Sequence, residues 1–418
     1  MKSNVTLTRY WKDIVLQATG NSSAQVIGLL GMPVLARIYS PEDFATQNIF
    51  LQIVMFLAGL MTWRYEYFFQ MLNVPSHAKH LFLWVVKLGF ISGSILTVLI
   101  YFMGDYIAKF LGVEKIGVYL LFAPCTAYLI SVALALQHCM QRDGLFKVSA
   151  ISEVFGKIFY VGSGFALSWF GTIGLILTSP FSAVGKIFFM RVRLRELFSR
   201  PTLAVARDEH PCARHAKGAN AMVLSHLFLT VSGSLPIFFI SYQYGVEELG
   251  QFTMVMATIF LPSGLVGVAI GQVFYQRAAQ QFRESNDIVP LWRETVRRLV
   301  FFGAPIYILA ILVSHIIYPL ILGVQWSDAG SYARIFSVAA FFSFISSPLD
   351  RISLILGVNR YLPIMHLVRM SVSVFFMGLA YFYQWNFVSY LFSLTVQMSF
   401  LYLTDMVFGR VFLARKQN

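Results

Sequence analysis

Residues 39–45 read Tyr-Ser-Pro-Glu-Asp-Phe-Ala, and residues 244–250 read Tyr-Gly-Val-Glu-Glu-Leu-Gly. Both stretches fit the pattern Y-[SG]-x-E-[DE]-[FL]-[AG], and they lie 205 residues apart in a chain of 418. Each follows an apolar stretch that contains a proline, which is Pro33 in the first case and Pro236 in the second. The sequence therefore predicts two halves built to the same design.

The composition is that of a membrane protein. Hydrophobic residues make up 57% of the chain and charged residues only 12%, against about 25% charged residues in soluble domains. The mean hydropathy is +0.68. Because lipid offers the backbone no hydrogen bonds, an apolar run of about 20 residues is expected to cross the bilayer as a helix. The first apolar run, near Ile14, lacks the pattern of a cleaved signal peptide, so we expect none.

Twelve membrane spans are expected. They are about residues 14–36, 44–63, 81–103, 117–140, 147–169, 172–190, 220–241, 250–273, 299–322, 332–357, 363–382 and 387–408. The prediction is an all-α polytopic membrane protein with a six-helix half at 1–196, a basic cytoplasmic connector at 197–219 and a second six-helix half with a basic tail at 220–418. Because each half has an even number of spans, a pseudo-two-fold axis along the membrane normal is expected to relate them.

Lys and Arg residues predict the orientation of the chain. If both termini lie in the cytoplasm, the cytoplasmic segments hold most of these residues, and the outer segments hold only Arg37, Lys109 and Lys115. This asymmetry follows the positive-inside rule. It accounts for the net charge of +13 without a nucleic-acid partner, because basic loops meet anionic lipid headgroups. The three cysteines are not placed for a disulfide framework.

Motifs for enzymatic chemistry are absent from the sequence. There is no P-loop, dinucleotide fingerprint or nucleophile elbow, so we expect no cofactor and no catalytic site. The stretch His-Pro-Cys at 210–212, with His215, lacks further ligands, so we expect no metal site either. Duplicated halves in a membrane protein are typical of transporters that rock one half against the other. The sequence therefore predicts a transporter rather than an enzyme.

Ionisable residues within membrane spans are energetically costly and are candidates for function. The cationic candidates for substrate binding are Arg64, at the inner mouth, Lys87, Lys157, Arg351 and Arg369. The acidic candidates for ion coupling are Glu66, Glu153 and Asp350. Glu153 and Lys157 are four residues apart on one helix, so they either neutralise each other or line a wet cavity together. Lys186 is one turn from the cytoplasmic end of its span and is expected to extend its ammonium group to the interface.

Neutral polar residues recur in the spans of the first half. Asn21 and Gln25 lie one turn apart on the first span, and Gln137 and Gln141 lie one turn apart on the fourth. Hydrogen bonding between helices explains any one pair. Together they indicate an aqueous interior, which suits a large, hydroxyl-rich, anionic ligand better than a small lipophilic drug. Asn21 and Gln25 are therefore further candidates for substrate binding.

Three stretches of sequence carry a family resemblance. Residues 37–44 read Arg-Ile-Tyr-Ser-Pro-Glu-Asp-Phe after an apolar span, and residues 63–66 read Trp-Arg-Tyr-Glu after the next. This pattern resembles the N-terminal signature of polysaccharide flippases, the O-antigen or Wzx-like proteins of the multidrug/oligosaccharidyl-lipid/polysaccharide exporter superfamily. Residues 322–332 also resemble the family's outer loop before span ten, a Gly-x-x-Trp-x-x-Ala-Gly pattern. Ala45 departs from the family's usual glycine.

The resemblance implies a function. Such a flippase moves an undecaprenyl-pyrophosphate-linked oligosaccharide repeat unit, of O antigen or a related surface polysaccharide, from the cytoplasmic to the periplasmic leaflet of a bacterial inner membrane by alternating access. The expected partners are this lipid-linked substrate and membrane lipids, with glycosyltransferases and a polysaccharide polymerase working beside it in lipopolysaccharide biosynthesis. A drug or small-molecule antiporter of the same superfamily would share the architecture and stays open. A membrane enzyme is disfavoured because every predicted outer loop is short.

Overall fold

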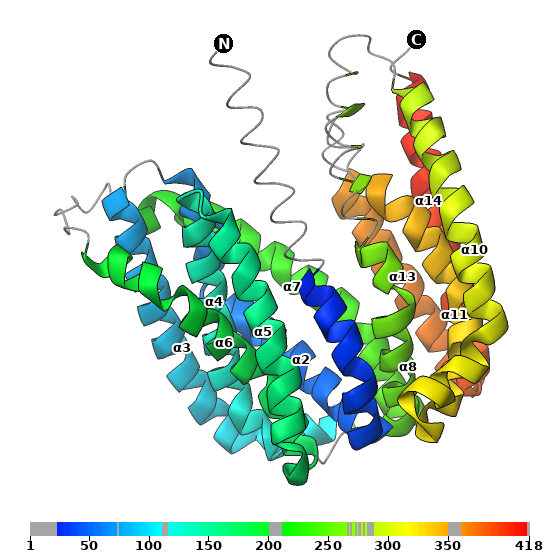
Figure 1. Ribbon diagram of the computed structural model, residues 1–418, viewed down its shortest axis with the longest axis horizontal. Helices are drawn as coiled ribbons and strands as arrows, with labels where there is room; N and C mark the ends of the chain where they lie inside the picture. The colour runs from blue at the N-terminus through cyan, green and yellow to red at the C-terminus, as the bar shows by residue number, and fades with distance from the viewer. Residues whose placement is uncertain are drawn as a thin grey trace. The chain divides into compact units, whose positions relative to one another are not determined.

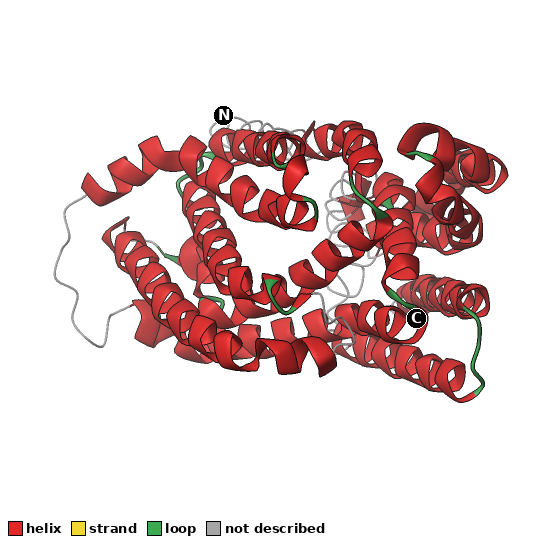
Figure 2. Cartoon of the chain, turned by 90° about the horizontal axis from the view of Figure 1, so that it is seen from below, coloured by secondary structure: helices red, strands yellow, loops and turns green. Residues whose placement is uncertain are grey.

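The chain is helical in the part that the structure describes. This computed structural model describes residues 23–72, 75–110, 116–199, 211–265, 288–349 and 361–415, with single residues between 266 and 287. Figure 2 shows helices and short loops, and no strand occurs among these residues. In chain order (Figure 1) the long helices are Ser23–Ile38, α2 (Pro41–Met61), α3 (Pro75–Phe110), α4 (Ala123–Arg142), α5 (Phe146–Ala166), α6 (Thr172–Ser199), α7 (Pro211–Tyr244), α8 (Val246–Ile259), α10 (Val289–Leu322), α11 (Ser327–Ser346), α13 (Tyr361–Phe382) and α14 (Phe387–Arg415).

Most of these helices suit a bilayer. Within the described residues, nine helices are long and apolar enough to cross a membrane. The other predicted spans correspond to the shorter apolar helix Ser23–Ile38, to α5, which carries Glu153 and Lys157, and to α8 with the partly described segment that follows it. The chain is a multi-pass, all-α membrane protein, as its composition predicted.

The repeated motif begins a helix in both of its copies. In the first copy, Asp43 N donates to Ser40 Oγ at 3.2 Å and Ser40 N donates to Asp43 Oδ2 at 2.9 Å, which together form a capping box at the start of α2. In the second copy, Gly245 precedes α8 with a φ of 101°, and an acidic pair lies in the first turn. Carboxylates there are favoured by the helix dipole. In the first copy, the motif itself therefore caps the helix that follows it.

The chain folds into two compact units, Met1–Phe238 and Phe239–Asn418. The boundary lies inside α7, just beyond Pro236, where the helix lacks one backbone hydrogen bond because proline has no N–H. Before Pro236, Ser234 of α7 hydrogen-bonds to Gln52 of α2, and Asn220 hydrogen-bonds to Trp63 in the turn after α2. The part of α7 before Pro236 therefore belongs to the N-terminal unit. The division at 197–219 rests on sequence repetition rather than on packing, and it stays a prediction.

In the N-terminal unit, α4 packs against α2, α3 and α6, and α5 packs along α6 (Figure 1). A cluster of buried apolar side chains, including Phe69, Leu81 and Leu136, joins α3 and α4 to the short 3-10 helix η1 (Tyr65–Met71). This packing fixes the turn between α2 and α3, which carries two of the candidate site residues.

The C-terminal unit is built around α11, which packs against α8, α10 and α14. Gln251 of α8 hydrogen-bonds to the short 3-10 helix η6 (Val324–Trp326) that precedes α11, and also to the first turn of α11. Its Nε2 donates to Gln325 O at 2.7 Å, and its Oε1 accepts from Ala329 N at 2.9 Å. Trp326 is fully buried beside these contacts. The Gly-x-x-Trp-x-x-Ala-Gly stretch singled out in the sequence therefore forms the hydrogen-bonded N-terminus of α11.

Candidate functional site

A polar cavity of about 520 Å³ lies in the N-terminal unit between helix Ser23–Ile38, α4 and α5. It is lined by Ala24, Gln25, Leu134, Gln137, His138, Gln141, Glu153 and Lys157. Gln137 and Gln141 of α4 are one turn apart, as are Glu153 and Lys157 of α5, so each pair presents its side chains from one helix face. The structure thus brings Gln25, from the first predicted span, together with Glu153 and Lys157, from the fifth.

Glu153 is held by two donors. Gln137 Nε2 donates to Glu153 Oε1 at 2.9 Å, and Lys186 Nζ of α6 donates to the same oxygen at 2.8 Å. The side chains of Lys186 and Glu153 are 24% and 23% exposed, so the ion pair is only partly screened by solvent. The expectation that Lys186 would extend to the interface is therefore wrong.

The physical reason is a glycine on α5. A Cβ atom added to Gly156 would lie 2.7 Å from Lys186 Cε, so only a residue without a side chain lets the lysine stem cross between α5 and α6. Lys186 thereby reaches Glu153. Of the two alternatives left open for Glu153 and Lys157, the structure shows both residues lining a cavity, whereas the ion pair of Glu153 joins two different helices.

Lys157 is left facing the cavity as a cation. Its Nζ lies 5.1 Å from the centre of the Tyr160 ring, a cation–π contact. It also runs along Gly28, where an added Cβ would lie 3.7 Å from the ammonium nitrogen. Among the described residues, no carboxylate lies within ion-pair distance of Lys157. The cavity lining and Lys186 together therefore carry one positive charge in excess, available to an anionic ligand.

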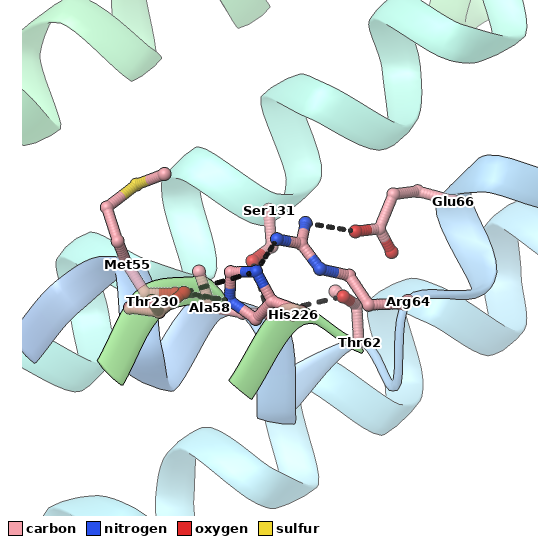
Figure 3. A network of polar contacts seen from close by, with 8 residues as sticks. All are labelled: Met55, Ala58, Thr62, Arg64, Glu66, Ser131, His226 and Thr230. Atoms are coloured by element: carbon pink, nitrogen blue, oxygen red, sulfur yellow. Dashed lines mark hydrogen bonds and ion pairs between the residues drawn. The ribbon is translucent and has the colours of Figure 1, made fainter. Parts of the chain in front are cut away.

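A second polar cluster joins the turn after α2 to α7. Arg64 Nη1 donates to Glu66 Oε1 at 3.0 Å, and Arg64 Nη2 contacts His226 Nδ1. His226 Nε2 lies 3.0 Å from Met55 O. The assignment consistent with both contacts has Nε2–H donating to the carbonyl and Nδ1 accepting from the guanidinium. Figure 3 shows the guanidinium between the carboxylate and the imidazole.

This cluster depends on two unusual backbone features. Trp63 and Arg64 have φ values of 50° and 56°, in the left-handed region that residues with side chains rarely adopt. Gly59 of α2 lies directly against His226, because an added Cβ would fall 1.9 Å from His226 Cδ2. Strained residues of this kind gather at functional sites. Trp63 Nε1 also donates to Asn220 Oδ1 at 2.6 Å, so the turn is attached to α7 at two points.

The C-terminal unit contains a third cluster, centred on Asp405 of α14. Tyr361 Oη donates to Asp405 Oδ1 at 2.6 Å, Ser346 Oγ donates to Oδ2 at 3.2 Å, and Arg369 Nη2 lies 4.0 Å from Oδ2. Arg369 also lies over the ring of Tyr402, 5.2 Å from its centre. Burial, together with the hydrogen bond and the charge of Asp405, raises the pKa of Tyr361 above its usual value.

Residues 34–331 match the protein family described as polysaccharide biosynthesis protein, a match that extends over more than half of the chain. The chain belongs to this family. The family resemblance that the motifs predicted is confirmed. A search of the curated proteins finds no match.

Solved transporter structures share the fold of this polysaccharide biosynthesis protein. The lipid II flippase MurJ, in an inward closed conformation, has a TM-score of 0.73 at 12% identity, over 94% of this chain and 87% of that chain. An inward-facing multidrug resistance MATE family transporter of the MOP superfamily has a TM-score of 0.69 at 14% identity, over 96% and 95%. A MOP superfamily transporter from Pyrococcus furiosus has a TM-score of 0.65 at 15% identity, over 97% and 96%. The predicted two-half transporter fold is thus confirmed.

One described candidate of this polysaccharide biosynthesis protein lies apart from the polar cavity. Lys87 is exposed on α3 and is not among the cavity residues. Asn21, Asp350 and Arg351 lie outside the described residues, so their predicted roles stay predictions. Among the residues that are described, no group of three or more His, Cys, Asp or Glu side chains could hold a metal ion.

Sequence reasoning did not single out Asp405 or His226. Asp405 lies inside the predicted span 387–408, so the rule that an intramembrane carboxylate marks function would have found it. For His226, no local signal shows that it meets Arg64, which is more than 150 residues away in the chain.

α14 of this protein also carries a stripe of buried polar atoms. Tyr390 Oη, Ser393 Oγ and both side-chain polar atoms of Gln397 have no hydrogen-bond partner among the described residues. These residues are three and four positions apart and therefore share one helix face. Buried polar atoms without partners are uncommon, and such sites are the ones that take up ordered water or a polar ligand.

Proposed function

We propose that this protein is a flippase that moves a polyprenyl-pyrophosphate-linked oligosaccharide from one leaflet of the membrane to the other by alternating access. The observation that carries the proposal is the polar cavity of the N-terminal unit, with Lys157 as a cation that has no ion-pair partner among the described residues. Membership in a polysaccharide biosynthesis family supports a glycan substrate. The fold supports transport rather than catalysis.

The chemistry of the cavity fits this substrate. Gln25, Gln137 and Gln141 offer amide donors and acceptors, which suit the hydroxyl groups of a sugar. Lys157 offers a positive charge to the pyrophosphate or to an acidic sugar. Glu153 is already neutralised by Lys186, so the cavity does not repel an anion. The polar atoms on α14 supply further neutral hydrogen-bonding capacity in the C-terminal unit.

The setting follows from the charge distribution. The excess of basic residues in the predicted inner segments supports cytoplasmic termini, and the family resemblance supports a bacterial inner membrane. The substrate would enter from the cytoplasmic leaflet as an O-antigen or related repeat unit, next to the glycosyltransferases that make it, and leave toward a polymerase. Glu66, Glu153 and Asp350 remain the candidate coupling carboxylates. Arg64 and Arg369 are the further cationic candidates, and each lies beside a carboxylate.

The test compares lysines of the same helix. Wild-type protein and the Lys157→Met, Lys157→Arg and Lys147→Met variants are placed in vesicles with undecaprenyl-pyrophosphate-linked N-acetylglucosamine, and flipping is followed through accessibility of the sugar to an external lectin. Lys147 is exposed at the start of α5 and serves as the control. We expect Lys157→Met to lower the flipping rate at least ten-fold and Lys157→Arg to retain part of the wild-type rate. Lys147→Met should flip the lipid at the wild-type rate.

A deletion strain of the source bacterium tests the same proposal in cells. Lipid-linked repeat units should accumulate on the cytoplasmic face, and the surface polysaccharide should disappear. Intact surface glycan with unchanged lipid-linked intermediates would overturn the proposal, and the drug or small-molecule antiporter would then become the leading function.

A further inference from the structure

The N-terminal unit contains a second cavity, of about 550 Å³, between α2, α3 and α7. Apolar side chains dominate its lining, including Ile53 and Phe56 of α2, Leu99 and Met103 of α3, and Val231 of α7. None of these residues belongs to the polar cavity. The cavity therefore offers an apolar environment, and the proposed transport mechanism assigns it no role.

The few polar residues of the lining are engaged with one another or with their neighbours. Ser234 Oγ donates to Gln52 Oε1 at 2.9 Å, and Thr230 Oγ1 lies 3.3 Å from His226 Nδ1. Both hydroxyl groups of the lining are therefore already engaged. A polar ligand would lose its own hydrogen bonds to water on entering, whereas a hydrocarbon chain loses none.

The cavity is elongated along the helices. On α3 its lining extends from Leu96 to Ile107, and on α7 it extends from Thr230 to Phe238. At 1.5 Å per residue these ranges correspond to about 16 Å and about 12 Å. An extended chain fits such a space better than a compact ring system of the same volume.

Side chains at the margin open the cavity to the surroundings of the unit. Leu99, Met103 and Val231 are 49%, 47% and 42% exposed, on helices that are apolar enough to lie in a bilayer. A lipid chain can therefore enter sideways, without first leaving the hydrocarbon phase.

One end of the cavity adjoins the cluster of Arg64, Glu66 and His226. Thr230 lines the cavity and also contacts His226, whose imidazole accepts from the guanidinium of Arg64. Because Glu66 already neutralises the guanidinium, this end is polar but carries no excess charge, and the apolar lining alone selects a long hydrocarbon chain.

We propose that this cavity seats the polyprenyl chain of the lipid-linked substrate while its head group is in transit. The inference rests on the proposed function, since that function supplies a substrate with such a chain. It assigns the chain and the glycan to different cavities of the same unit, one lined by α2, α3 and α7 and the other by helix Ser23–Ile38, α4 and α5.

Photocross-linking tests the assignment directly. The photoreactive residue p-benzoylphenylalanine is placed at position 99, at the cavity margin, or at position 98. Val98 is the matched control because it is 57% exposed, is absent from the lining and points about 100° away around the same helix. The full-length protein is reconstituted in phosphatidylethanolamine and phosphatidylglycerol vesicles with undecaprenyl-pyrophosphate-linked N-acetylglucosamine. Mass spectrometry identifies the cross-linked lipid.

We expect the yield of polyprenyl adduct at position 99 to exceed that at position 98 at least five-fold. We also expect added substrate to reduce phospholipid adducts at position 99. Equal polyprenyl yields at the two positions would overturn the assignment, as would phospholipid adducts at position 99 that the substrate does not displace, because the cavity would then hold only membrane acyl chains.

Filling the cavity gives an independent readout in the flipping assay. Leu99→Trp is expected to lower the flipping rate at least five-fold, and Val98→Trp is expected to leave it unchanged. If the wild type flips the probe and both variants match it, the chain is not seated here, although the proposed function stands. If the wild type does not flip the probe, the proposed function fails and the assignment of its substrate to this cavity fails with it.

Discussion

Replacing Gly59 by alanine tests whether α2 and α7 approach each other as closely as described. The added Cβ would lie 1.9 Å from His226 Cδ2 and 2.2 Å from its Nε2, far inside van der Waals contact. The imidazole is attached to Met55 O and to Arg64, so it cannot move aside without breaking one of these contacts. Gly59→Ala should therefore separate Arg64 from His226.

Three contributions set the magnitude. Forcing an extra methyl group into a packed contact costs about 1–3 kcal/mol, and losing a hydrogen bond to a charged group costs about 1.5–3 kcal/mol. Alanine in place of glycine inside a helix stabilises by about 1 kcal/mol. The first two outweigh the third, so we expect a net destabilisation of about 1.5–5 kcal/mol. Thermal unfolding should then shift downward by roughly 3–20 °C.

The assay is the thermal midpoint of the detergent-solubilised protein, followed by tryptophan fluorescence. Gly162→Ala is the matched control, since Gly162 lies in α5 and an added Cβ there meets nothing within 4 Å. That variant should be neutral or slightly stabilised. In the double variant with His226→Ala, the clash is gone, so the two changes together should cost less than their sum. A midpoint for Gly59→Ala equal to that of Gly162→Ala would refute the close approach.

Other side-chain contacts give further predictions for the same measurement. Lys186→Met leaves Glu153 with only Gln137 as a donor and should destabilise by about 1–2 kcal/mol, since the pair is partly exposed; an unchanged midpoint would show that the pair contributes nothing. Tyr361→Phe removes a donor to Asp405 and should cost about 1–3 kcal/mol. Because the pKa of Tyr361 is raised, this contribution is complete below about pH 10 and is lost only as the pH rises further, so the variant and the wild type should differ equally at about pH 6 and 9. Gln251→Ala removes both hydrogen bonds to the N-terminus of α11 and should lower the free energy of unfolding by about 1–3 kcal/mol. Gln243→Ala is the control, since the hydrogen bond of Gln243 to Gln384 is exposed, and it should change the stability little. Equal effects of the two variants would contradict the role given to Gln251.

The helices and their starts could be predicted because their signals are local. Apolar runs of membrane length and the repeated Glu-Asp or Glu-Glu motif act through neighbouring residues, so the capping box at Ser40 and Asp43 could be expected from seven residues of sequence. The unit boundary could not, because it depends on which side chains of α7 find partners far away in the chain.

The polar cavity was predictable in part for the same reason. Gln25, Glu153 and Lys157 could be named because each is a polar residue in an apolar span. Their pairing could not be predicted, since it depends on the absence of a side chain at Gly156, which lets Lys186 through from α6. Glycine inside a helix has several possible reasons, and the sequence does not say which neighbour uses the space.

α7 is a single helix whose two parts belong to different units. The part before Pro236 contacts the rest of the N-terminal unit through polar side-chain contacts of Asn220, His226 and Ser234. At Pro236 the carbonyl of Ser232 has no amide to accept from, so flexing the axis there breaks no backbone hydrogen bond. The polar cavity, built from helix Ser23–Ile38, α4 and α5, takes none of its lining from α7, so a bend at Pro236 leaves its walls in place.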